Sequence, residues 1–164
     1  AAELGVADYV TFTGRVPDRE MLAMLNTADV CVNPDVANDM NDISTMNKIM
    51  EYMALGKAIV QFDLTEGRYS AQSASLYARR DDFRDFAAKI LTLLDDPARR
   101  HAMGELGRRR VLEALAWRHQ VPALLACYDL LRPVDPAARQ EPRRQASHRS
   151  KAPRQEASHE APTA

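Results

Sequence analysis

The stretch NDISTMNKIMEYMALGKAIVQFD, residues 41–63, decides the fold. Its first residues are polar and read as an irregular loop, and its middle has the apolar spacing of a short helix. Its end is an apolar run that predicts a buried strand. Gly56 follows the helix at the position where a positive φ is easy for glycine. A helix that leads at once into a buried strand is typical of a parallel α/β sheet.

The predicted helix has two faces. Its apolar side chains recur at spacings of three and four and should pack on the sheet; they are Met46, Ile49, Met50 and Met53. The same spacing predicts a polar face made of Ser44, Asn47, Lys48 and Glu51. Ser44 or Thr45 is expected to cap the helix N-terminus.

The start of this helix is the candidate ligand site. Because the helix precedes its strand, the helix N-terminus should lie at the carboxyl edge of the sheet, where open α/β sheets bind ligands. Free backbone N–H groups there favour a phosphate. Lys48 adds a charge for a diphosphate, and the Glu51 carboxylate can accept hydrogen bonds from both hydroxyls of a ribose. The competing interpretation is a surface ion pair between Lys48 and Glu51, which the spacing alone favours.

Short apolar segments and amphipathic helices alternate along the rest of the ordered chain. Strands are predicted at residues 10–13, 30–32 and 58–62, with a further short strand at 75–78. Gly14 ends the first strand, and Pro17 with Asp18 opens the next helix. The pattern predicts an α/β fold with a doubly wound parallel sheet covered on both faces.

The remainder to Leu131 is predicted to be helical. Asp81 or Asp82 can cap a helix whose apolar side chains are Phe83, Phe86, Ile90, Leu91 and Leu94. Asp95-Asp96-Pro97 breaks that helix, an arginine-rich helix follows, and Trp117 begins the last one. The arginines are expected to form a solvated face, and Trp117 is expected to anchor the last helix against the domain.

Composition changes at the end of the chain. Residues 133–164 contain no Leu, Ile, Phe, Tyr, Trp or Met and hold five of the nine prolines. Such a segment cannot bury enough apolar surface to offset its ordering entropy. We therefore predict a partial α/β domain at 1–131 and a disordered low-complexity tail at 132–164. The tail is weakly basic, so peripheral contact with acidic lipid or a partner is the alternative to a solvated tail.

Bulk properties exclude several classes of protein. The net charge of −1 gives no electrostatic case for nucleic acid as a partner. No apolar run approaches the length of a transmembrane helix, and no signal peptide is recognisable. Cys31 and Cys127 suggest neither a metal site nor a disulfide framework, and a reducing cytoplasm fits this cysteine usage. Because the chain starts without Met, inside what reads as the end of a helix, we expect a piece of a longer protein.

The motifs together resemble a known family. VTFTGRVP, ADVCVNP, the 41–63 stretch, LLDDPARRHAMGELGRRRV and then Trp117 follow one another as in the C-terminal, nucleotide-sugar-binding domain of retaining glycosyltransferases of the GT-B fold. This domain is Rossmann-like. The resemblance covers about residues 1–131, and the block MNKIMEYMALGKAIVQFDLTEGR looks closest to the family 4-like bacterial enzymes that build surface polysaccharides and lipopolysaccharide.

The resemblance implies roles for particular residues. It implies that Glu51 binds the donor ribose and that the loop at residues 38–47 contacts the donor sugar and diphosphate. The loop at residues 63–68 would face the same cleft. The nucleotide base would lie against Gly14, Arg15 and Val16. The donor-binding set is therefore Gly14, Arg15, Val16, Asp42, Ser44, Thr45, Asn47, Lys48 and Glu51.

Two departures from the family pattern affect this assignment. Many relatives have a second glutamate eight residues before the ribose-binding one, where this chain has Ile43. Their Gly-Phe-Gly loop is replaced here by residues 42–45. Asp42 is expected to take over the sugar contact by a one-residue shift and is the candidate catalytic residue. The family's acceptor-binding N-terminal domain and the basic phosphate clamp would precede Ala1.

The implied reaction is transfer of a hexosyl unit from a nucleoside diphosphate sugar to a hydroxyl acceptor with retention, with no metal or other cofactor. This chain alone is expected to be inactive because the acceptor half is missing. Two alternatives stay open: a nucleotide-sugar epimerase that shares the fold, and a non-catalytic nucleotide-binding remnant.

Overall fold

The computed structural model describes residues 1–131, and the predicted disordered tail lies outside the described residues. Within residues 1–131, three strands and seven α-helices follow one another. The strands are β1 (Cys31–Asn33), β2 (Ile59–Phe62) and β3 (Ser75–Ala78). The helices are α1 (Asp18–Thr27), α2 (Asp39–Ile43), α3 (Asn47–Ala54), α4 (Thr65–Ala71), α5 (Phe83–Leu94), α6 (Pro97–Arg110) and α7 (Trp117–Leu131).

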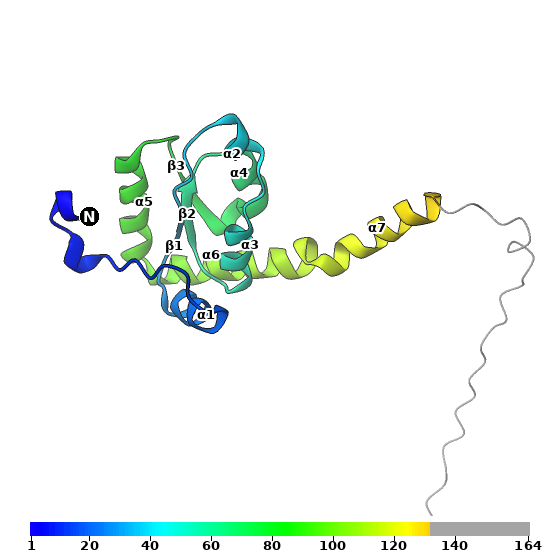
Figure 1. The fold of residues 1–164 in the computed structure, drawn as a ribbon, viewed down its shortest axis with the longest axis horizontal. Helices are drawn as coiled ribbons and strands as arrows, with labels where there is room; N and C mark the ends of the chain where they lie inside the picture. Colours follow the sequence, from blue (N-terminus) through cyan, green and yellow to red (C-terminus); the bar gives the residue numbers. More distant parts are fainter. Residues whose placement is uncertain (132–164) are drawn as a thin grey trace, which may run out of the picture.

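The sheet is parallel, with strand order β1-β2-β3. Its central strand β2 is buried along its whole length. The face that carries Val60 and Phe62 packs on α5 and α6, and the face that carries Ile59 packs on α3 and on the chain after α4. Helices on both faces of a parallel sheet are the predicted fold class, and Figure 1 shows the sheet between α5 and α3.

The stretch at residues 41–63 forms the predicted helix, α3, and the predicted strand, β2. Ile49 and Met53 of α3 are fully buried, and Met46 packs against the same cluster. Gly56 has a φ of 68° directly after the helix, as predicted. Met50 is half-buried, and Tyr52 instead joins the apolar contacts. The short strand at 75–78 and the Asp82 cap of α5 are also as predicted.

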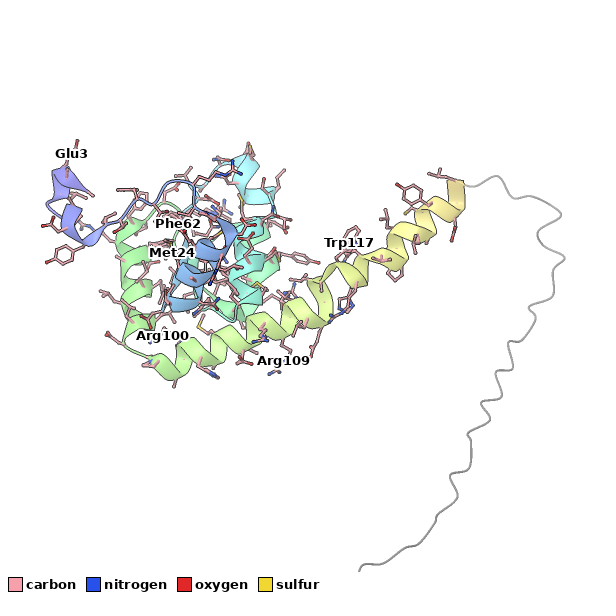
Figure 2. The ribbon with its side chains drawn as sticks, turned by 60° about the horizontal axis from the view of Figure 1, so that its bottom comes forward. Glu3, Met24, Phe62, Arg100, Arg109 and Trp117 are labelled. Carbon is pink, nitrogen blue, oxygen red and sulfur yellow. The ribbon has the colours of Figure 1, made fainter. Side chains whose placement is uncertain are left out.

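Three local predictions are wrong. Residues 10–13 are not a strand but an exposed segment, because no neighbouring strand is present among the described residues to pair with them. Trp117 is 66% exposed and does not anchor α7; Figure 2 shows it where α7 leaves the body of the domain. In α5, Phe83 and Leu91 are exposed, whereas Leu93 is fully buried.

A close backbone contact joins α6 to the turn after α3. A Cβ added to Gly104 would lie 1.9 Å from the carbonyl oxygen of Gly56. Gly56 is itself held by its positive φ, so neither backbone can move aside cheaply. This contact sets the distance between α6 and the decisive stretch, because only a residue without a side chain fits there.

We predict that Gly104→Ala lowers the free energy of unfolding by about 3 kcal/mol or more, the upper part of the range for overpacking against rigid neighbours. Urea unfolding followed by circular dichroism measures it. Glu105→Ala, a change at the next and exposed residue, is the matched control and should alter stability by less than about 0.5 kcal/mol. Equal stability of Gly104→Ala and wild type would contradict the close contact.

Candidate functional site

The loops that follow the three strands are tied together at the carboxyl edge of the sheet. Arg80, after β3, donates to the Asp63 carbonyl after β2 at 2.8 Å and to Asp42 Oδ1 at 2.7 Å. The Ala37 N–H, after β1, donates to Asp81 Oδ1 at 2.9 Å. Figure 1 shows α2 and α4 at this end and α1 at the other. These bonds place the predicted ligand loop on a fixed support.

Asp42 joins α2 to the start of α4. Its Oδ1 accepts from the Thr65 N–H at 2.9 Å, and its Oδ2 accepts from the Thr65 hydroxyl at 2.8 Å. These hydrogen bonds, and next the charge of Arg80, lower the pKa of the Asp42 carboxyl below 3.8. Asp42 is therefore ionised at neutral pH and accepts from the first N–H of α4, whose own N-cap residue Leu64 provides no side-chain cap. Its expected contact with a donor sugar stays a prediction.

Helix α3 begins without a side-chain cap. Its N-cap residue is Met46, and the N–H groups of Asn47 and Lys48 donate to no acceptor among residues 1–131. Of the other helices that start at this edge, α2 and α5 have the side-chain caps Asn38 and Asp82. Helix α4 has no cap of its own, but Asp42 accepts from its first N–H, that of Thr65. The free donors and positive dipole end of α3 therefore face the carboxyl edge uncompensated.

The expected caps have other roles. Ser44 ends α2 and its hydroxyl donates to the Met40 carbonyl, so the prediction that Ser44 or Thr45 caps α3 is wrong. The Thr45 hydroxyl donates to Glu66 Oε1 of α4 at 2.7 Å. The polar stretch before α3 folds into the short helix α2, and Ser44 is the C-cap of that helix.

Lys48 pairs with Asp35 rather than with Glu51. Its Nζ lies 2.9 Å from Asp35 Oδ1, on the loop that follows β1. Glu51 is exposed, and its carboxylate makes no hydrogen bond or ion pair with any described residue. The surface ion pair that spacing alone favoured is therefore absent from this structure. Glu51 is left with its acceptors open to solvent.

A second basic side chain at this edge is also neutralised. Arg68 donates to both oxygens of Asp63, at 2.8 and 2.6 Å, and lies over the Tyr77 ring at 4.2 Å from its centroid. Burial raises the pKa of Tyr77 to about 12. The bidentate hydrogen bonds with Arg68 lower the pKa of Asp63. The pair ties the first turn of α4 to the end of β2, and residues 65–68 of the predicted cleft loop are therefore helical.

The three residues predicted to contact the base lie apart from the others. Gly14, Arg15 and Val16 directly precede α1, which lies at the opposite end of the domain in Figure 1. No hydrogen bond or ion pair links them to the other candidate residues of the described chain. Residues 42–51 thus lie on α2, α3 and the turn between them, whereas residues 14–16 lie before α1, and the shared donor site stays a prediction.

Sequence reasoning missed three residues of this site, namely Asn33, Asp35 and Arg80. Arg80 ties the loops together, Asp35 holds Lys48, and Asn33 is a buried polar residue where β1 ends. The signal was available for two of them. Polar residues that directly follow a buried strand lie at the ligand edge of an open sheet.

Comparison with protein families gives one match. The family described as "Glycosyl transferases group 1" matches residues 1–96, which include the sheet and α1 to α5. The match extends over more than half of the chain.

Two curated relatives are similar over most of the chain. One is the MMP alpha-(1->4)-mannosyltransferase of Mycolicibacterium hassiacum, 28% identical over 131 residues, covering 78% of this chain and 31% of that protein. The other is the 2-deoxystreptamine glucosyltransferase of Streptomyces kanamyceticus, 26% identical over 133 residues, covering 78% and 32%. The chain thus spans about a third of the length of these relatives.

A solved structure has the same fold. Sucrose-phosphate synthase from Thermosynechococcus elongatus superposes with a TM-score of 0.70 at 23% sequence identity, covering 79% of this chain and 32% of that one. This fold is the GT-B fold of glycosyltransferases. Within residues 1–131, no helix combines the length and apolar character needed to cross a bilayer.

The Asp42 cap leads to a pH-dependent prediction. Asp42→Asn should lower the thermal midpoint at pH 7, because the ionised carboxylate holds Thr65 and Arg80. A lowered folded pKa gives stability that is present above the unfolded value of 3.8 and lost as pH falls through the folded value. The difference between wild type and variant should therefore shrink below about pH 4 in calorimetric scans.

Asp39→Asn is the matched control for this experiment, since Asp39 is exposed in the same short helix and makes no ion pair among the described residues. Its thermal midpoint should follow that of wild type at every pH. A constant gap between Asp42→Asn and wild type from pH 7 to pH 2 would contradict the role of the ionised cap.

Proposed function

The chain belongs to the group 1 glycosyl transferase family, and we propose that its carboxyl edge binds the nucleoside diphosphate part of a sugar donor. The complete protein would transfer a hexosyl unit to a hydroxyl acceptor with retention of configuration. Synthesis of a bacterial polysaccharide or lipopolysaccharide is the proposed context, and the cytoplasm, where nucleotide sugars are made, is the proposed location.

The uncapped start of α3 is the observation that carries this proposal. The N–H groups of Asn47 and Lys48 donate to no acceptor among residues 1–131, and they lie at the positive end of the dipole of an eight-residue helix. Helix starts of this kind bind phosphate because the donors are preorganised and the helix end is positive. At the starts of α2, α4 and α5, by contrast, a side chain of the chain itself already accepts from an N–H group of the first turn.

Lys48 and Glu51 supply the next two contacts. The Lys48 side chain is 37% exposed while it is paired with Asp35, so its ammonium group can also reach a ligand phosphate. Glu51 lies one turn further along α3 with both oxygens open, which suits the two hydroxyls of a ribose. The order along the helix is therefore phosphate first and ribose second.

In this proposal, catalysis depends on the departing diphosphate. The α3 N–H groups and Lys48 would stabilise the charge that develops on it, without a nucleophile from this chain. Asp42 would contact the sugar with lone pairs that its bonds to Thr65 and Arg80 leave free. Because those bonds also fix its position, Asp42 would present a negative charge at a constant place beside the reacting carbon.

The acceptor would bind to a part of the protein that this chain does not span. The relatives' remaining length, about two thirds of each protein, is sufficient for a second domain of similar size. An interdomain cleft would exclude water and bring donor and acceptor together. We propose that the base of the nucleotide contacts residues 14–16 only when that second domain is present.

Glu51→Gln should weaken nucleoside diphosphate binding about ten- to a hundredfold, since a charged acceptor for two hydroxyls is lost. Its thermal midpoint should stay at the wild-type value because Glu51 makes no hydrogen bond or ion pair in the described chain. Isothermal titration with UDP, GDP and ADP measures the affinity. Glu105→Gln, an exposed glutamate on α6, is the control and should bind like wild type.

Lys48→Ala separates the diphosphate from the nucleoside. The variant should bind the nucleoside diphosphate more weakly, while its affinity for the corresponding nucleoside stays at the wild-type value. Wild-type diphosphate affinity in both the Lys48 and the Glu51 variant would exclude this helix as the donor site.

A further inference from the structure

Two buried oxygen atoms beside the proposed phosphate site have no hydrogen-bond partner. They are Asn33 Oδ1 and Asp35 Oδ2, and no donor among the described residues reaches them. Asn33 is only 2% exposed. Buried polar atoms are almost always satisfied in native proteins, so an orphan at the edge of a ligand site calls for an explanation.

The strand register shows which way Asn33 points. Asn33 pairs with Gln61, and Cys31 pairs with Ile59, so these side chains share the face that α3 and α4 cover. On that face the side-chain Nε2 of Gln61 donates to the Gly67 carbonyl of α4 at 3.3 Å. Asn33 lies in the same row, on the side of α3, and its oxygen has no such partner.

Asp35 follows two residues later, and its Oδ2 is the second buried oxygen without a partner. Its Oδ1 is held at 2.9 Å by the ammonium group of Lys48, and Lys48 lies in the first turn of α3. Asn33 and Asp35 are separated only by Pro34, whose ring stiffens the turn. The end of β1 therefore presents two fixed acceptors next to the uncapped helix start.

The chemistry of these atoms limits the ligand. Both unpaired oxygens are acceptors, so the ligand group must donate hydrogen bonds. The Lys48 ammonium on Asp35 repels a metal ion or a second ammonium group. A ligand hydroxyl suits both conditions, because it is neutral and it donates.

We propose that Asn33 and Asp35 form a hydroxyl-binding subsite that recognises the polyol part of the donor, either its ribose or its hexose. This inference rests on the proposed function, since the polyol would be carried by the nucleotide at α3. Lys48 has two roles in it: it holds Asp35 in place and it meets the diphosphate. The subsite lies on β1 and its loop, apart from Glu51 on α3.

The test compares ligands that differ in hydroxyl groups across matched variants. Isothermal titration uses UDP, its 2′,3′-dideoxy form and UDP-glucose, with GDP, its dideoxy form and GDP-mannose as the second series. The variants are Asn33→Leu and Asp35→Ala. Gln61→Leu is the control, because it removes a buried amide from the same row, but one that already has a partner.

Asn33→Leu should have a thermal midpoint equal to or above that of wild type, since it removes a buried acceptor that is unpaired. Its affinity for the ligand that carries the hydroxyls should fall about tenfold. Its affinity for the matched ligand without those hydroxyls should stay at the wild-type value. Gln61→Leu should have the opposite profile, with a lower thermal midpoint and unchanged discrimination. Asp35→Ala should bind inorganic pyrophosphate more tightly than wild type, because Lys48 is no longer paired. It should also lose discrimination, that is, the difference in affinity between ligands with and without the hydroxyls.

The two sources of hydroxyls separate within the same data. If the variants lose only the difference in affinity between the ribo and dideoxy forms, the subsite binds ribose. If they lose only the difference between the nucleotide sugar and the nucleotide, it binds the hexose. Wild-type discrimination in both Asn33→Leu and Asp35→Ala overturns the inference. If Asn33→Leu does not fold, Asp35→Ala decides alone.

Failure of the proposed function gives a different result. If wild type binds none of the nucleotides, nitrogen-15 NMR of the Asn33 side-chain amide is followed during addition of ribose, glucose and mannose. A shift that Asp35→Ala removes supports the subsite without a nucleotide. No shift with any of the three sugars overturns it.

Discussion

The burial of β2 on both faces is the constraint on which the rest of the structure depends. All four of its residues are buried, and each face is covered by helices that lead into or out of the sheet. Because parallel strands need crossover helices, α3 and α4 must return to the same edge. Burying one short strand thus brings the starts of α2, α3, α4 and α5 together at the carboxyl edge.

The ligand site follows from how these helix starts are satisfied. At three of them a side chain of the chain accepts from an N–H group of the first turn, and Asp42 does so while Arg80 ties it to the loop after β2. Only at α3 of the four does no described side chain accept from such a group, and beside it lie an exposed glutamate, a paired lysine and two unpaired buried acceptors. The capped starts provide rigidity, and the uncapped start provides the binding capacity.

Local patterns predicted the elements well, because Gly56, Asp82 and the apolar runs act within a few residues of themselves. They failed where the outcome depended on distant partners. Residues 10–13 have strand chemistry, but no strand lies beside them within residues 1–131. Lys48 has Glu51 at helical spacing yet pairs with Asp35, thirteen residues away. Ser44 was misplaced because α2 takes up the polar stretch that read as a loop. Asn33 and Asp35 follow a buried strand, which was a usable signal, but their unpaired buried oxygens are visible only in the folded chain.

The central claim is tested most directly by locating the residues that a nucleoside diphosphate perturbs when it binds. Backbone amide shifts in a nitrogen-15 NMR titration with UDP or GDP should be largest at the start of α3, in residues 47–51, and at the end of β1. The amino edge around Lys57 and Arg100, and the hollow lined by Arg109 and Arg110, should be unaffected. Shifts centred on either of those two regions, with residues 47–51 unchanged, would contradict the account.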